Sequence, residues 1–116
     1  MDKYIILNLF HIFFVSPLLI YIGIQRGGSP EWIYMFLIIL SIVVFSYHLF
    51  KLYTKLIKGS SGLWVNLMHI LLIAPVLFVI GYYGKATIRA FFEVALLLGF
   101  AALGYNIYNL FIQLNK

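Results

Sequence analysis

The stretch YIILNLFHIFFVSPLLIYIGI, residues 4–24, is long and apolar enough to form a membrane-spanning helix. An α-helix needs about 20 such residues to cross a hydrocarbon core about 30 Å thick. Three similar runs follow, at residues 32–52, 63–83 and 90–112. The runs are continuous rather than alternating, which favours helices over the strands of a β-barrel. The sequence therefore predicts an all-α integral membrane protein with four transmembrane helices.

The composition also favours a bilayer as the surrounding solvent. Hydrophobic residues make up 65% of the 116 residues and charged residues 9%, with a mean hydropathy of +1.07. Soluble domains have about 45–50% apolar and about 25% charged residues. The chain has no cysteine, which excludes disulfides and thiolate metal sites. Its net charge of +5 does not indicate nucleic-acid binding, because the basic residues lie at the ends of the apolar runs and form no basic stripe.

An internal repeat organises the chain. A shift of 58 positions superimposes Asn8-Leu9-Phe10-His11-Ile12 on Asn66-Leu67-Met68-His69-Ile70, and Pro17 on Pro75. We interpret residues 1–116 as one membrane domain built from two tandem helical hairpins, repeat 1 at 1–58 and repeat 2 at 59–116. Because each repeat has two spans, the repeats share one orientation, and a pseudo-two-fold axis along the membrane normal is expected.

The basic residues predict the orientation. Five lie on the side of the two termini and the middle loop, and three lie on the other side. The five are Lys3, Lys51, Lys55, Lys58 and Lys116, and the three are Arg26, Lys85 and Arg89. This bias places both termini on the cytoplasmic or interior side. The first run is half of repeat 1, so we expect it to be retained rather than cleaved as a signal peptide.

Polar side chains fall at a similar depth in all four helices and form a predicted layer near the side of the termini. The layer comprises His11, His48, His69, Asn106, Asn8, Asn66, Tyr47 and Tyr105. Such side chains are costly inside a membrane and usually face the bundle interior. The favoured interpretation is hydrogen bonding between helices. Two alternatives are a proton or ion path through the histidines, and a heme or metal ion held by His11 and His69.

Two prolines inside the predicted helices indicate local disturbances. Pro17 and Pro75 each remove a backbone donor and push against the preceding turn, so bends are expected near Phe13 and Leu71. Packing kinks are the favoured interpretation, and gating hinges around a central cavity are the alternative.

The fourth helix carries small residues on one face. Ala95, Gly99 and Ala102 recur at three- and four-residue spacing, which permits close approach of another helix. The corresponding face of the second helix is bulkier, so the two hairpins are not expected to pack identically. On the fourth helix Arg89 and Glu93, four residues apart, are expected to form an ion pair near the membrane surface.

No catalytic pattern accompanies these features. The sequence has no phosphate-binding glycine loop, nucleophile elbow or paired carboxylates, so an enzyme is not expected. We interpret the chain as a small structural or assembly protein of a membrane, with lipid as its partner and a homo-oligomer as a further option. A channel or small transporter and a heme- or metal-binding electron carrier are the alternatives.

The pattern N-L-x-H-I with proline six residues after the histidine occurs once in each repeat, with Pro17 and with Pro75. In this respect the chain resembles small uncharacterised tandem-hairpin membrane proteins of large DNA viruses. The resemblance covers both hairpins and implies a location in a virion or host membrane. It implies no catalytic residues.

Overall fold

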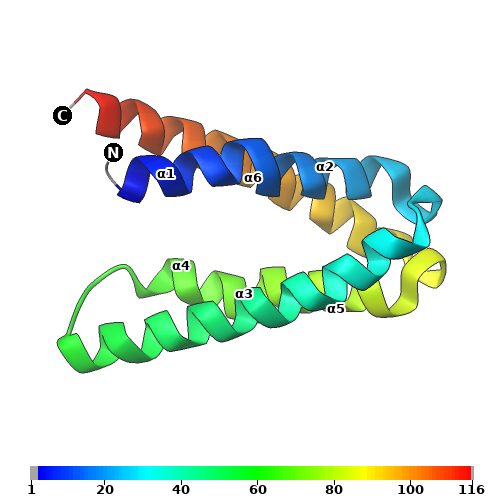
Figure 1. Cartoon of the computed structure of the whole chain (residues 1–116), viewed down its shortest axis with the longest axis horizontal. Coiled ribbons are helices and arrows are strands. Elements are labelled where there is room, and N and C mark those ends of the chain that lie inside the picture. Colours follow the sequence, from blue (N-terminus) through cyan, green and yellow to red (C-terminus); the bar gives the residue numbers. More distant parts are fainter. Residues whose placement is uncertain (1–2, 116) are drawn as a thin grey trace. The chain divides into compact units, whose positions relative to one another are not determined.

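The computed structural model describes residues 3–115, which form helices and no strand (Figure 1). Among these residues, four helices are long and apolar enough to cross a membrane. They are Lys3–Gly28, Glu31–Lys58, Leu63–Ala86 and Arg89–Leu114. The prediction of four such helices and an all-α fold is confirmed, and each helix extends beyond its predicted apolar run.

The first and third spans each contain one wide turn. In the first span, α1 (Lys3–Phe10) leads through a π-helical turn (His11–Val15) into α2 (Ser16–Gln25). In the third span, α4 (Leu63–Met68) leads through a π-helical turn (His69–Ile73) into α5 (Ala74–Tyr83). A π-turn holds more residues per turn than an α-helix and shifts the hydrogen bonds from i−4 to i−5.

Proline explains the position of these π-turns. In a regular helix the ring of Pro17 would collide with the carbonyl of Phe13, and that carbonyl would find no N–H donor at residue 17. The Ser16 N–H instead donates to the His11 carbonyl five residues earlier, and the Ala74 N–H donates to the His69 carbonyl in the same way. The π-turns therefore lie where the sequence predicts a disturbance, around Phe13 and Leu71.

The second and fourth spans are uninterrupted helices, α3 (Glu31–Lys58) and α6 (Arg89–Leu114). Helix α3 begins after Pro30, whose fixed φ suits a helix start. It ends at Gly59, which adopts the left-handed conformation with φ 67°. The Ser60 N–H then donates to the Lys55 carbonyl at 2.9 Å, the bond that closes a glycine-terminated helix.

The turn after the first span and the turn after the third span have the same backbone geometry. Arg26 has φ 53° and ψ −122°, and Gly84, 58 positions later, has φ 55° and ψ −126°. This region of backbone space suits glycine, so Gly84 adopts it at little cost. Among the described residues Arg26 is the one non-glycine residue with positive φ. Arginine occupies a glycine position at this turn.

The chain divides into two compact units that do not coincide with the two sequence repeats. One unit contains residues 3–26 with residues 92–115, and the other contains Gly27–Phe91. Each unit thus pairs the first helix of one repeat with the second helix of the other: α1 and α2 lie beside α6, and α3 lies beside α4 and α5 (Figure 1). The partners within each unit are antiparallel.

In the unit of α2 and α6, glycines bring the two backbones together. A Cβ on Gly23 would lie 2.8 Å from Leu96 Cα, and a Cβ on Gly99 would lie 2.9 Å from the Ile20 backbone nitrogen. Ala95 is fully buried on the same face of α6, and Ala102 is half-buried. The small-residue face of α6 therefore packs against α2, and absence of side chains sets their close approach.

The unit of α3 and α5 uses a glycine at the corresponding position. A Cβ on Gly81 would lie 2.8 Å from the Tyr34 carbonyl oxygen and 3.0 Å from the Ile38 backbone nitrogen. Gly81 lies 58 positions after Gly23, and Ile38 lies 58 positions before Leu96. Ser41 stands in α3 where Gly99 stands in α6. The two units therefore share one glycine contact and differ at the next position along the helix face.

Candidate functional site

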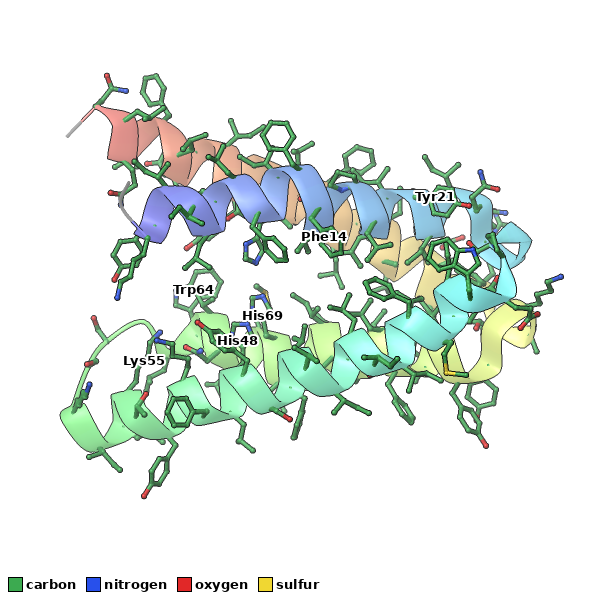
Figure 2. All side chains as sticks on the ribbon, in the orientation of Figure 1. Phe14, Tyr21, His48, Lys55, Trp64 and His69 are labelled. Atoms are coloured by element: carbon green, nitrogen blue, oxygen red, sulfur yellow. The ribbon has the colours of Figure 1, made fainter. Side chains whose placement is uncertain are left out.

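The most developed polar arrangement lies between α3 and α4. It consists of Lys55, Asn66, His48 and His69, which we call the Lys55 network. Figure 2 labels Lys55, His48 and His69 of this network. Lys55 and His48 come from α3, seven residues apart and so on one helix face, two turns from each other. Asn66 belongs to α4, and His69 begins the π-turn that follows. The network thus joins the second helix of repeat 1 to the first helix of repeat 2.

Asn66 is the centre of the network. The Lys55 ammonium donates to Asn66 Oδ1 at 2.7 Å, and Asn66 Nδ2 lies 3.1 Å from His48 Nδ1. An ammonium group can only donate, so the amide oxygen must face Lys55 and the amide NH2 must face His48. His48 Nδ1 is then an acceptor, and the imidazole is neutral with its proton on Nε2. Asn66 is 2% exposed, so both bonds are shielded from solvent on the asparagine side.

Lys55 also reaches the loop that follows α3. Its ammonium nitrogen lies 3.3 Å from the carbonyl oxygen of Gly62, the residue before α4. Gly62 itself has φ 82°, in the left-handed region. One lysine therefore contacts the end of the connecting loop and a buried side chain of the next helix. From the sequence, Lys55 was used only to predict the orientation, although its seven-residue spacing from His48 already places both on one helix face.

The two histidines of this unit stack on each other. The ring centroids of His48 and His69 are 3.9 Å apart with an interplanar angle of 14°. His69 Nδ1 lies 2.7 Å from the Val65 carbonyl oxygen, so Nδ1 donates and carries the proton. The ring of Tyr47 meets His48 edge-on at 5.2 Å. A stacked pair with both Nδ1 atoms engaged is a packing arrangement, held by ring contact and by hydrogen bonds on either side.

The remaining polar residues of the predicted layer lie in the other unit. His11 Nδ1 lies 2.7 Å from the Leu7 carbonyl oxygen, which repeats the bond of His69. Asn106, 58 positions after His48, donates to the Ala102 carbonyl at 2.7 Å. Asn8 is buried, and Tyr105 is exposed. The structure thus brings His48, Asn66 and His69 together in one unit, while Asn8, His11 and Asn106 belong to the other.

The stacked pair of His48 and His69 does not fit axial ligation of one heme. Two imidazoles that ligate one heme iron point their nitrogens at the metal from opposite faces of the macrocycle. The stacked rings of His48 and His69 instead lie face to face at 3.9 Å. Within residues 3–115, no group of three or more histidine, cysteine or acidic side chains is placed to hold a metal ion. The alternative pair, His11 and His69, is divided between the two units.

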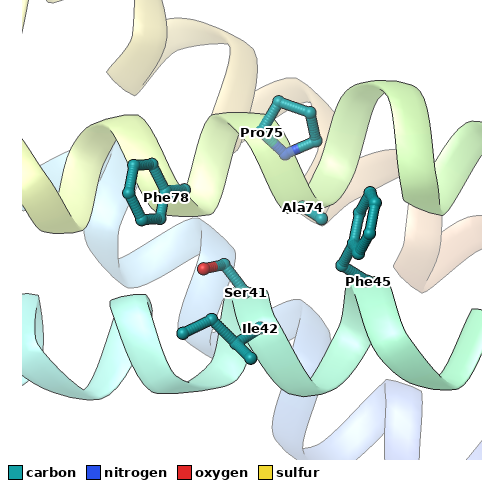
Figure 3. A pocket seen from close by; sticks show the side chains of 6 residues that line it. All are labelled: Ser41, Ile42, Phe45, Ala74, Pro75 and Phe78. Carbon is teal, nitrogen blue, oxygen red and sulfur yellow. The ribbon is translucent and has the colours of Figure 1, made fainter.

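A hollow of about 250 Å³ opens beside the π-turn of the third span (Figure 3). Its lining is almost wholly apolar: Ser41, Ile42, Phe45, Ala74, Pro75 and Phe78. The Ser41 hydroxyl, the polar group of this lining, donates to the Ile38 carbonyl of its own helix at 2.7 Å. The corresponding place in the other unit is where Gly99 meets Ile20 in close contact. The hollow thus lies where Ser41 stands in place of a glycine.

The predicted ion pair of Arg89 and Glu93 lies in the first turns of α6. Arg89 begins α6 and Glu93 lies one turn later, and both are exposed. Their ion pair stays a prediction.

The buried hydroxyls of Ser16 and Ser29 are the side-chain groups of the described chain that are buried without a hydrogen-bond partner. Neither was singled out from the sequence, because a serine in an apolar run gives no sign of whether its hydroxyl finds an acceptor.

Comparisons with protein-family models, with curated proteins and with solved structures found no match to this chain.

Proposed function

We propose that this chain is a small four-span integral membrane protein with a structural or assembly role, in which the Lys55 network fastens the two sequence repeats to each other. Large apolar side chains in the middle of the helices support the membrane location. Phe13, Leu71 and Leu97 are each at least 69% exposed, and a bilayer would solvate them where water would not.

The observation that carries the structural role is the position of Asn66 between two residues of α3. Asn66 bonds to Lys55 and to His48, and all three lie where α4 packs against α3. Hydrogen bonds between membrane helices contribute about 0.6 kcal/mol each on average. Bonds that involve a charged group contribute more, about 1.5–3 kcal/mol in water. Hydrogen bonds of this combined free energy are adequate to fix which helices pair. The polar groups of the Lys55 network bond to one another.

The duplication gives this role a reason. Local structure recurs 58 residues later at the π-turns, at the turns of Arg26 and Gly84, and at the glycine contacts of Gly23 and Gly81. We infer that the repeats are related by a pseudo-two-fold axis along the membrane normal, and that each repeat supplies one helix to each unit. Because each unit contains one helix from each repeat, neither repeat can pack without the other.

The sequence pattern and the exposed surface support a membrane location and partners for the protein. The resemblance of the N-L-x-H-I pattern supports a virion or host membrane as its location. The exposed apolar faces are suited to lipid and to further copies of the chain. We propose no enzymatic activity, because the polar groups of the site are used in hydrogen bonds between or within helices.

The structural role is tested by substitution within the Lys55 network. Asn66→Leu removes the group that bridges Lys55 and His48 and leaves a cationic side chain beside an apolar one, so it should lower the free energy of unfolding in detergent by about 1–3 kcal/mol. His48→Asn preserves an acceptor near the position of Nδ1 and should be close to the parent. Ser46→Leu, at an exposed position of the same helix, is the matched control and should be neutral.

The same preparations separate the structural role from the alternatives. Visible absorption and proton flux in liposomes should both be negative for the parent protein. A Soret band would favour the electron carrier, and a flux that is lost in folded His48→Asn would favour the channel. Equal stability of Asn66→Leu and the parent would contradict the structural role.

A further inference from the structure

We propose that the Lys55 network is a pH-sensitive latch, in which proton uptake by His48 releases α4 and the loop Gly59–Gly62 from α3. This inference rests on the proposed structural role of the network and adds its regulation. The latch follows from the fact that one asparagine bridges two groups that can both carry a proton.

The side-chain amide of Asn66 limits how many of its two neighbours can carry a positive charge. A side-chain amide has one oxygen, which accepts, and one NH2, which donates. The Asn66 oxygen faces the Lys55 ammonium at 2.7 Å, so the NH2 is the end of the amide that faces His48 at 3.1 Å. This arrangement needs an unprotonated His48 Nδ1. The network therefore accommodates one cation, and Lys55 already supplies it.

Protonation of His48 creates a conflict that the amide cannot resolve by turning over. An imidazolium carries an N–H on Nδ1, which would face the NH2 of Asn66, two donors in contact. Rotation of the amide would present its oxygen to His48 and its NH2 to the Lys55 ammonium, which recreates the conflict on the other side. One of the two bonds must break, and either break weakens the attachment of α4 to α3.

The other groups around His48 act in the same direction. On its own helix, Lys51 lies one turn toward the C-terminus, with its ammonium 5.9 Å from the centroid of the Tyr47 ring. Helix α4 contributes no titratable side chain, and the π-turn contributes His69, which is stacked on His48 at 3.9 Å. Lys51 and Lys55 place positive charge on the same stretch of α3 as His48, and no described acidic side chain lies on these elements near it. Like charges repel, so a proton on His48 would add to the positive charge of this stretch.

The latch belongs to one unit only. In the other unit the position of His48 is taken by Asn106 and the position of Lys55 by Gln113, neither of which titrates. The corresponding positions of the other unit therefore carry no side chain that takes up a proton between pH 5.0 and pH 7.5. This asymmetry supplies an internal control.

Because the chain has no cysteine, a single nitroxide label can be placed at will. Leu67→Cys on α4 carries the reporter, and Leu9→Cys, the corresponding position on α1, carries the control. The full chain in liposomes is measured by electron paramagnetic resonance at pH 7.5 and pH 5.0, the interval in which histidine takes up a proton. The mobile component of the spectrum at Leu67 should increase at pH 5.0, and the spectrum at Leu9 should not change.

Two variants of the Leu67-labelled chain identify the cause. His48→Asn keeps an acceptor for Asn66 but cannot titrate, so the spectrum should stay immobile at both pH values. Lys55→Gln removes the competing cation, so Asn66 can turn over toward a protonated His48, and the change at pH 5.0 should be lost. A change like that of the parent in either variant would overturn the latch, and so would a mobile spectrum of His48→Asn at pH 7.5.

The outcome also separates this inference from the proposed function. A pH-independent spectrum of the parent together with a destabilised Asn66→Leu variant would leave the structural role in place and exclude the latch. An Asn66→Leu variant as stable as the parent would remove both.

Discussion

Gly99 lies directly against Ile20, so close that a Cβ at residue 99 would come within 2.9 Å of the Ile20 backbone nitrogen. This contact joins α6 to α2 at a point where no room remains for a side chain at residue 99. Five residues later on α6, Gly104 has no atom within 4 Å of its ideal Cβ position. Two glycines on one helix thus differ only in what faces them.

We therefore expect opposite effects from the same substitution at these glycines. Gly99→Ala should be destabilising by about 1–3 kcal/mol, because the added methyl forces the helices apart. Gly104→Ala should be stabilising by up to about 1 kcal/mol, since alanine favours the helix and nothing obstructs it. Thermal unfolding in detergent compares the two variants. Equal melting temperatures for both would show that the close contact of α2 and α6 does not hold.

The backbone strain at Arg26 should be relieved when this residue is replaced by glycine. Arg26 holds φ 53° and ψ −122°, a conformation that costs a non-glycine residue about 1–3 kcal/mol. Arg26→Gly should stabilise the protein, whereas Arg26→Ala loses the side chain and keeps the strain. The difference between the two variants isolates the backbone contribution. In the reverse direction, Gly84→Ala should be destabilising, and a stable Gly84→Ala variant would contradict the argument.

The buried hydroxyl of Ser16 should be dispensable. Ser16 is fully buried without a hydrogen-bond partner, and its counterpart in repeat 2 is Ala74. Ser16→Ala is expected to stabilise the protein by about 1 kcal/mol, because an unsatisfied polar group is removed from an apolar site. Ser41→Ala is the control, since Ser41 has an acceptor at 2.7 Å and should gain nothing. Chemical unfolding in mixed micelles measures both. A loss of stability in Ser16→Ala would mean that the hydroxyl is in use.

The termini should lie on the same side of the membrane. Four spans require this, and the five lysines near the termini and the middle loop predict that this side is the cytoplasm or an equivalent interior. Reporter tags placed before residue 1 and after residue 116 test it by protease protection. Termini on opposite sides would refute the four-span arrangement, and both termini outside would refute only the charge argument.

The length and local form of the helices could be predicted from the sequence. An apolar run of about 20 residues has to form a helix in lipid, since the backbone must satisfy its own hydrogen bonds. Pro17 and Pro75 each disturb the helix at the turn that precedes the proline, and the π-turns lie there. The 58-residue repeat follows from residue identity alone.

The candidate site could be predicted in part. His48, Asn66 and His69 were expected at one depth, and the structure places them in contact. Lys55 was expected only at the interface, because a lysine near a helix end ordinarily extends toward water and headgroups. Its bond to buried Asn66 depends on how α4 lies against α3, which no spacing within one helix specifies.

The sequence by itself determined that the chain forms four apolar helices, that a residue pattern recurs 58 positions apart, and where its prolines widen the helices. These features depend on the backbone and on the solvent around each helix, so a single segment is enough to decide them. Only the tertiary structure decided that α6 pairs with α2 while α3 pairs with α5, across the repeats rather than within them. The reason is that pairing depends on close approach between distant residues. Gly23 meets Leu96, Gly81 meets Ile38, and Ser41 lines a hollow at the position where Gly99 contacts Ile20 in the other unit.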